Sequence, residues 1–255
     1  MAVNVEDQTE QTSNRNAFIA ISAIFLLSGM GLYTVYLFFP EMEPEEKPYV
    51  TLPTSLESAK DLGRVLSNYT DDNFAMVLLA FFCTYIFLQS FAIPGSIFLS
   101  FLSGFLFPFP LALLTVCLCS AIGASLCYLI SYCVGRRLIM HYFPDRVEKL
   151  KKQVSNHENN MLYYIIFLRI TPFLPNWLIN VASPIVSVNL APFFLGTFLG
   201  VAPPSILAIR AGISLQQLAS ANVMFTLENG LLLTGFAVLS MIPVVLRNRF
   251  KNKFE

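Results

Sequence analysis

The chain lacks charge over most of its length. Only 13% of its 255 residues are charged, whereas 55% are apolar. Two long stretches, residues 73–144 and 159–227, contain no Asp or Glu. The mean hydropathy of +0.62, together with several apolar runs long enough to cross a bilayer, excludes an ordinary soluble domain. We therefore expect a polytopic membrane protein built from α-helices.

The sequence also offers little for metal, disulfide or catalytic chemistry. It has 2 His and 5 Cys, and the cysteines all lie inside apolar runs, at Cys83, Cys117, Cys119, Cys127 and Cys133. Thiols in such surroundings behave as small apolar side chains, so neither a zinc site nor a disulfide framework is expected. No nucleophile stands beside a base, and no phosphate-binding loop or ATPase signature is present. We expect no enzymatic activity, metal, cofactor or nucleic acid partner.

Lys and Arg are concentrated in two segments. The loop at 136–158 has six of them and the tail at 247–255 has four. Residues 40–72 are instead rich in Asp and Glu, and residues 213–227 carry no charge. Because loops rich in Lys and Arg stay on the cytosolic side of a membrane, we expect the loop and both termini to be cytosolic.

These crossings divide the chain into consecutive parts. They are a disordered cytosolic N-terminus (1–16), a transmembrane anchor (17–39), a lumenal segment with an interfacial helix (40–72), a core with two re-entrant hairpins (73–213), a transmembrane span (228–246) and a basic cytosolic tail (247–255). In the lumenal segment, Thr54 and Glu57 match a capping box. One face of the following turns is apolar, which predicts a helix lying on the lumenal membrane surface.

The number of crossings predicts the hairpins. Residues 73–135 must cross an odd number of times, although they contain two or three apolar pieces. A hairpin that enters and leaves on the lumenal side, with its tip at Pro94 and Gly95, followed by one span, satisfies this condition. Residues 161–188, followed by a span, repeat the arrangement from the cytosolic side. The predicted fold is an all-α polytopic membrane protein with two inverted re-entrant helical hairpins plus transmembrane spans.

The candidate site lies at residues 167–180, which read FLRITPFLPNWLIN. Arg169 stands here in an apolar segment without any acidic partner. A lone guanidinium at membrane depth costs at least ~2.5 kcal/mol, so it should face protein, a wet cavity or an anion. A lipid phosphate is such an anion, because the planar guanidinium binds two oxygens at once. Alternatively, Arg169 caps carbonyls freed by Pro172 and Pro175, or its head reaches the membrane interface.

Small residues recur in both predicted spans of the core. They include Gly123 and Gly135 in the first span, and Gly196 and Gly200 in the second. Spacings of three or four residues put small side chains on one helix face, which predicts close helix packing.

The C-terminal tail holds a second pattern. Lys251 and Lys253 stand fifth and third from the end. This spacing resembles a dilysine signal that returns proteins to the endoplasmic reticulum, and the expected cytosolic tail suits it. The alternative is a short basic tail that only satisfies the charge rule for topology.

Four motifs in order, FAIPGSIFLSFLSGFLFPFPLAL, VGR, FLRITPFLPNWLIN and GTFLGVAPPS, resemble the VTT or DedA family. The resemblance implies an ATP-independent phospholipid scramblase of the endoplasmic reticulum membrane that equilibrates phosphatidylserine and other phospholipids, with cholesterol as a further candidate. It also implies roles in autophagosome formation, lipid droplets and lipid homeostasis, and other VTT-family membrane proteins as candidate partners. The matching motif positions are Arg169, Pro172, Pro175 and Asn180, with Pro94 and Gly95 at the facing tip.

This chain departs from bacterial members of the family, which look like proton-coupled transporters with carboxylates in the first hairpin. Around Gln89 and Ser96 the residues are neutral, so a proton carrier is missing and passive exchange is expected. In the predicted groove, Arg169 attracts the phosphate, while Asn176, Asn180 and Gln89 form hydrogen bonds with the headgroup. Two alternatives stay open: a proton- or ion-coupled lipid transporter, and a membrane scaffold that transports nothing.

Overall fold

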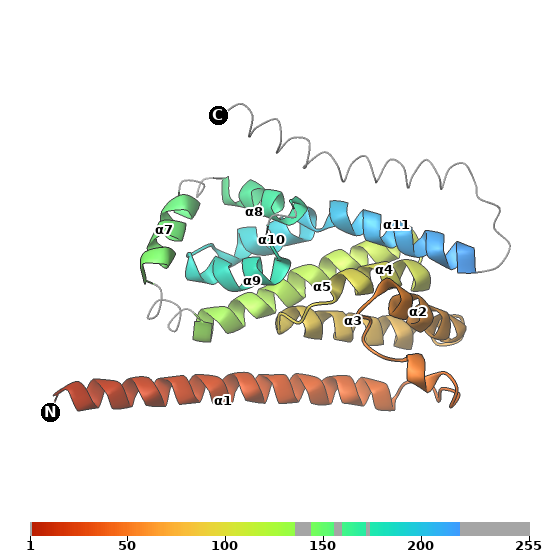
Figure 1. The fold of residues 1–255 in the computed structure, drawn as a ribbon, viewed down its shortest axis with the longest axis horizontal. Helices are drawn as coiled ribbons and strands as arrows, with labels where there is room; N and C mark the ends of the chain where they lie inside the picture. The colour runs from red at the N-terminus through yellow and green to blue at the C-terminus, as the bar shows by residue number, and fades with distance from the viewer. Residues whose placement is uncertain (1, 136–143, 156–159, 172–173, 220–255) are drawn as a thin grey trace.

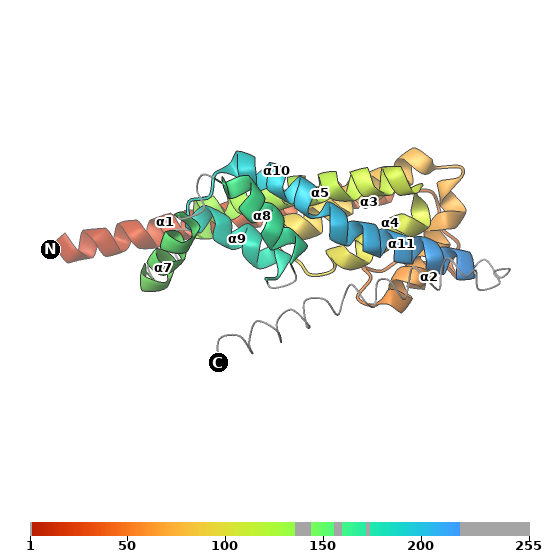
Figure 2. The ribbon, with the colours of Figure 1, turned by 90° about the horizontal axis from the view of Figure 1, so that it is seen from above.

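The computed structural model describes residues 2–135, 144–155, 160–171 and 174–219. Within these ranges every regular element is a helix and there is no strand, so the expectation of an all-α fold is confirmed. Figures 1 and 2 show an elongated bundle with helix α5 near its centre. The expected span at 228–246 and the tail with Lys251 and Lys253 lie outside the described residues.

Helix α1 spans Ala2–Leu37. It runs along one side of the bundle and contacts α3, which spans Phe74–Ser90. The ring of Phe25 packs on two rings at the end of this neighbour, 5.4 Å from Phe87 and 4.9 Å from Phe91 between centroids. The sequence predicts a disordered segment at 1–16 before the span at 17–39. In the structure, α1 begins at Ala2 and includes most of both segments.

A linker with one 3₁₀ turn, Lys47–Tyr49, leads to α2, Leu56–Thr70. The capping box is formed by other residues than the expected Thr54 and Glu57. Ser55 accepts a hydrogen bond from the backbone N–H of Ser58 at 3.1 Å, and the Ser58 hydroxyl accepts one from the N–H of Ser55 at 3.0 Å. Serine is the better cap here because it alone stands directly before the first helical turn.

The apolar face of α2 is buried against α4, which spans Ser96–Leu106. A Cβ atom added at Gly63 would lie only 2.9 Å from the ring of Phe105. A neighbouring helix thus covers the face that the sequence predicts to be apolar, and the position of α2 at the lumenal membrane surface stays a prediction. At the far end of α2, Tyr69 donates a hydrogen bond to Glu46 and thereby lowers the pKa of that carboxyl.

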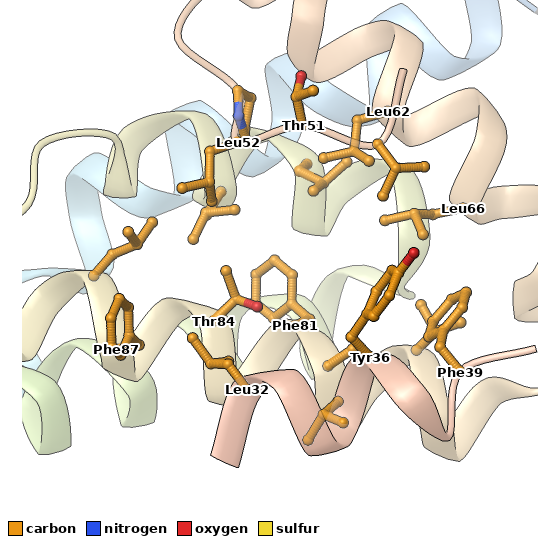
Figure 3. A pocket seen from close by; sticks show the side chains of 18 of the residues that line it. Leu32, Tyr36, Phe39, Thr51, Leu52, Leu62, Leu66, Phe81, Thr84 and Phe87 are labelled. Carbon is orange, nitrogen blue, oxygen red and sulfur yellow. The ribbon is translucent and has the colours of Figure 1, made fainter. Parts of the chain in front are cut away.

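The linker before α2 also turns inward. Pro53 is buried, and its backbone oxygen would be 3.8 Å from a Cβ atom added at Gly95. Together with α1, α2, α3 and α4, this linker borders a cavity of about 330 Å³, into which Leu52 and Tyr36 point (Figure 3). The tip of the first hairpin thus lies beside the linker.

Helices α3 and α4 form the first hairpin. After α3 the chain turns through Ala92, with φ 56°, and Gly95, with φ 131°. The N–H of Ile93 bonds to the carbonyl of Leu88 at 2.9 Å, which satisfies an acceptor at the end of α3. A φ of 131° is strained for any residue with a Cβ, so glycine is needed at the start of α4.

Helix α5, Phe109–Ile130, follows and ends in a π-helical turn, Ser131–Gly135. Pro108 caps its start, where a missing N–H costs nothing. It contacts α3, α9, α10 and α11, and therefore joins the two halves of the bundle. The helical stretch Phe109–Cys133, which is α5 with the first residues of the π-helical turn, is long and apolar enough to cross a membrane.

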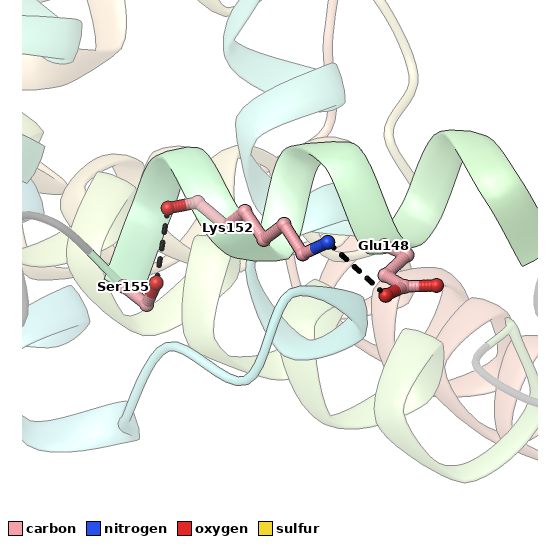
Figure 4. A network of polar contacts seen from close by, with 3 residues as sticks. All are labelled: Glu148, Lys152 and Ser155. Carbon is pink, nitrogen blue, oxygen red and sulfur yellow. Dashed lines mark hydrogen bonds and ion pairs between the residues drawn. The ribbon is translucent and has the colours of Figure 1, made fainter.

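The second half of the bundle is built from five further helices. They are α7 (Pro144–Ser155), α8 (Met161–Ile170), α9 (Asn176–Ile185), α10 (Leu190–Gly200) and α11 (Ala202–Ala219). Helices α8 and α9 cover the residues of the expected second hairpin. The stretch Leu190–Gln217 is the other one long enough to span a membrane among the described residues. Helix α7 is basic and exposed, and its pair between Lys152 and Glu148 at 3.4 Å contributes little stability (Figure 4).

Candidate functional site

Arg169 stands in the last turn of α8, and its side chain is only 4% exposed. Its guanidinium carbon lies 5.4 Å from the centre of the Phe193 ring on α10. A buried cation of this kind needs hydrogen bonds to compensate for the water it has lost.

Among the described residues, the guanidinium donates its hydrogen bonds to neutral oxygens. One terminal nitrogen donates to the Asn180 side-chain oxygen at 2.6 Å and to the Thr197 hydroxyl at 3.0 Å. The other donates to the side-chain oxygen of Asn176 at 3.2 Å and to its backbone oxygen at 3.4 Å. The buried Nε has no partner among the described residues. The positive charge is thus solvated by protein dipoles, and these four residues form what we call the Arg169 cluster.

The local structure explains this arrangement. Helix α8 ends at Ile170, and Pro175 caps the start of α9. Asn176 and Asn180 are four residues apart on α9, so both side chains lie on the same face. The short turn between the helices brings that face to the end of α8, where Arg169 is located.

Helix α10 approaches α8 closely through two glycines. A Cβ atom added at Gly200 would be 2.7 Å from the Arg169 Cβ, and one at Gly196 would be 2.7 Å from the Ile165 Cβ. Real Cβ atoms do not come so close, so only glycine fits at either position. This close approach carries Thr197, which stands directly after the first of the two, to the guanidinium.

A second buried polar group connects the first hairpin to α5. The Tyr85 hydroxyl lies 3.1 Å from the Ser100 hydroxyl and 3.0 Å from that of Ser120. These three residues come from α3, α4 and α5.

The structure brings together only some of the predicted site residues. Arg169, Asn176 and Asn180 are in contact, whereas Gln89 is buried on α3 against the helix that carries Gly123. A Cβ atom at Gly123 would be 2.6 Å from the Gln89 Cβ. In this structure Arg169 is enclosed by protein and does not line an open groove.

The remaining predicted residues occupy turns. Pro94 is exposed in the tip between α3 and α4, next to Gly95. Pro175 is an exposed cap, Gly135 ends the π-helical turn, and Pro172 lies outside the described residues. Arg169 also contacts the backbone carbonyl of Asn176 at 3.4 Å, which is not one of the carbonyls that Pro172 or Pro175 would free, so the capping alternative stays a prediction.

Sequence reasoning missed Thr197 and the hydroxyls around Tyr85. Thr197 stands between the two glycines of a small-residue motif, directly after Gly196, so its place on the packing face could have been recognised. The serines at 100 and 120 carry no such signal, because hydroxyls within a helix usually bond to their own backbone.

Comparisons with known proteins agree in one family. The family model described as the VTT domain matches residues 93–214. Transmembrane protein 41B of Xenopus laevis is 51% identical over 247 residues, which cover 97% of this chain and 89% of that protein. The Homo sapiens protein of the same name is 50% identical over 246 residues, covering 96% and 84%. The Gallus gallus protein is 49% identical over 248 residues, covering 97% and 92%. No solved structure matches the chain.

Proposed function

Because the chain belongs to the VTT-domain family that includes transmembrane protein 41B, we propose that it is an ATP-independent phospholipid scramblase of the endoplasmic reticulum membrane. Its substrates are phosphatidylserine and other phospholipids, with cholesterol as a further candidate. The proposal includes no catalysis and no cofactor. It places both termini in the cytosol, includes other VTT-family proteins as partners, and assigns a role in autophagosome formation and lipid homeostasis.

The observation that carries this proposal is the Arg169 cluster. Arg169 is only 4% exposed, and the oxygens that accept its hydrogen bonds are neutral. The protein therefore keeps an uncompensated positive charge in its interior. Such residues mark the paths of ions or substrates in membrane proteins. The class of substrate that suits this charge is an anion, and a phospholipid phosphate is the anion that a bilayer supplies.

The hairpin geometry supports an arrangement in which both tips end inside the membrane. Helix α4 has 11 residues and helices α8 and α9 have 10 each. Helices of this length rise about 15 Å, which is half of a hydrocarbon core about 30 Å thick. Helices α4, α8 and α9 can therefore each reach the middle of the bilayer but cannot cross it alone, whereas α3, with 17 residues, rises about 26 Å and ends at that depth only when it is tilted.

The mechanism follows from an exchange of partners. In the closed state, Asn176, Asn180 and Thr197 occupy the guanidinium. When the α8–α9 hairpin moves away from α10, a phosphate replaces these oxygens, because hydrogen bonds between two charged groups are about twice as strong as neutral ones. The headgroup then passes the polar interior while the acyl chains stay in the bilayer. In this proposal no ion gradient drives the cycle, so lipid exchange runs in both directions.

The test is a fluorescent-lipid exchange assay in proteoliposomes without any ion gradient. We expect rapid exchange by the native chain and at least tenfold slower exchange by Arg169→Leu and Asn180→Leu. A matched control is Asn160→Leu, since Asn160 is exposed before α8 and its side chain makes no capping hydrogen bond.

Other results would support the alternatives. Exchange that appears only with an imposed pH gradient would indicate a proton-coupled transporter. No exchange from correctly folded native protein, with or without a gradient, would indicate a scaffold and would contradict the proposal.

A further inference from the structure

A long apolar cavity follows helix α1. Its larger chamber has a volume of about 580 Å³ and lies between α1, α3 and α5. The residues of α1 that line this chamber recur at helical spacing along one face, at Ile21, Ile24, Ser28, Gly31 and Leu32. We call this chamber together with its continuation the α1 furrow.

The continuation is the cavity of about 330 Å³ beside the linker, shown in Figure 3. Leu32 and Phe87 line both chambers, so the two are neighbours along α1. In Figure 3, Leu32 of α1 lies beside Thr84 of α3, and Tyr36 points from α1 toward Leu66 of α2 at one end of the hollow. The furrow therefore extends from the expected cytosolic half of α1 to its lumenal end.

The chemistry of the larger chamber excludes water as a natural occupant. No charged residue lines it. The hydroxyl of Ser28 donates to the Ile24 carbonyl at 2.7 Å, and that of Ser90 to the Ile86 carbonyl at 2.7 Å. Both hydroxyls thus use their donors within their own helices. A bound water needs two to four polar partners, which this lining does not offer.

The dimensions of the chamber match one leaflet of a bilayer. The stretch of α1 from Ile21 to Leu32 rises about 17 Å, close to half of a hydrocarbon core about 30 Å thick. In a membrane, a dry chamber of this length beside a transmembrane helix is filled by hydrocarbon, because lipid tails surround it and no polar group repels them. A single flexible chain follows such a slot better than a rigid ring system.

We propose that the larger chamber of the α1 furrow binds one acyl chain of a membrane phospholipid, from the leaflet nearer to the N-terminus of α1. The bound chain holds α1 against the bundle, together with the contacts of Phe25 to the aromatic rings of α3. This site is separate from the Arg169 cluster, so it stands or falls independently of lipid exchange.

Two glycines on α1 provide a matched pair of variants. A Cβ atom added at Gly31 or at Gly29 would meet nothing within 4 Å, but only Gly31 lines the chamber. A side chain can thus start from either position without a clash at its Cβ atom, and leucine favours the helix more than glycine does. Gly31→Leu therefore fills the chamber, whereas Gly29→Leu changes the same helix outside it. Ser28→Leu, whose residue also lines the chamber, is a second filling variant.

The probe is a phosphatidylcholine with a photoactivatable diazirine at the end of one acyl chain, added to the purified full-length protein. We expect crosslinks on the lining segments of α1, α3 and α5. Gly31→Leu and Ser28→Leu should reduce them at least fivefold, and Gly29→Leu should leave them unchanged. Thermal unfolding of each variant checks that the fold is retained.

Three outcomes would overturn the assignment. Equal labelling of the native chain and the filling variants would show that the lipid binds elsewhere. Stronger labelling of the same peptides by a photoactivatable sterol would make a sterol the occupant. A photoreactive amino acid can also be placed at Leu129, which lines the chamber. If it crosslinked to residues 228–246 or to a second copy of the protein, the chamber would be covered by protein and not by lipid.

Discussion

At the scale of single residues, the neutrality of the ligands around Arg169 is the informative feature. A carboxylate would hold the guanidinium more tightly than an amide does, and would cancel its charge. Asn180 provides the shortest contact to the guanidinium, at 2.6 Å, without cancelling its positive charge. The side chains thus solvate the cation well enough to bury it, yet leave it able to attract an anion.

The substitution Asn180→Asp tests this interpretation. It keeps the size of the side chain but places a negative charge beside a cation that is already buried. We expect thermal stability to stay the same or rise, because the pair neutralises itself. Lipid exchange should slow at least tenfold, a barrier increase of about 1.4 kcal/mol, since a phosphate must now displace a carboxylate.

The control for this variant is Asn176→Asp. Asn176 is exposed, and its contacts to Arg169 are longer, at 3.2 and 3.4 Å. Water screens the new charge there, so the effect on exchange should be smaller. Unchanged or faster exchange by Asn180→Asp, measured in the same vesicles, would contradict the role given to neutral ligands.

The Arg169 cluster was predictable in part for physical reasons. A charged residue in an apolar segment has few acceptable partners, and the two amides that follow Arg169 within its own motif, Asn176 and Asn180, are the ones that the structure shows. Gln89 was grouped with them on polarity alone, and helix packing places it against α5 instead. Thr197 comes from a helix far along the chain, and one sequence carries no direct signal of that contact.

At the scale of elements, the tightest contact is the crossing of α4 and α11. A Cβ atom added at Gly104 would lie 2.2 Å from the Ile209 carbonyl oxygen, and one at Gly212 would lie 2.1 Å from that of Phe101. The two backbones therefore touch at this crossing. In lipid, helices associate through close packing of small residues and not through the hydrophobic effect. The crossing of α4 and α11 is a contact of this kind.

The substitution Gly212→Ala should separate these two helices. No Cβ atom fits 2.1 Å from a backbone oxygen, so α11 must shift away from α4. We expect a loss of about 1–3 kcal/mol of stability, measured as a lower unfolding temperature in detergent. Gly104→Ala should act in the same direction.

Gly29→Ala is the matched control for the crossing. Nothing lies within 4 Å of a Cβ atom at Gly29, and alanine in place of glycine favours a helix by about 1 kcal/mol. Its unfolding temperature should rise or stay constant. If Gly212→Ala behaved in the same way, the close crossing of α4 and α11 would be disproved.

The positions of the helices were easier to predict than their neighbours. Proline and glycine interrupt the chain at Pro94, Gly95 and Pro175, and the helices of both hairpins end there. An amphipathic pattern gives the buried face of α2 but does not identify the helix that covers it, which is α4. Gly104 and Gly212 each have a small residue four positions earlier, Ser100 and Ala208, but such a pattern does not identify the helix that packs on it.

At the scale of the whole molecule, α5 connects the two hairpins, and α2 and α7 lie near its opposite ends (Figure 1). A helix of this length and composition is long and apolar enough to cross a membrane. The counting of crossings in the sequence predicts that it does cross, and the elements at its two ends would then face different compartments. That arrangement stays a prediction, which depends on the requirement that apolar segments stay in the bilayer and charged loops do not.

Cysteine labelling in sealed microsomes tests this two-sided arrangement. In a Cys133→Ser background, we introduce Ser155→Cys on α7 and, separately, Glu57→Cys on α2, both at exposed positions. A membrane-impermeant maleimide should label Ser155→Cys at once and Glu57→Cys only after permeabilisation. Permeabilised samples, in which both react, are the control. Labelling of both in intact vesicles would put the two ends of α5 on one side, so α5 would not cross and the inverted hairpins would lose their membrane basis.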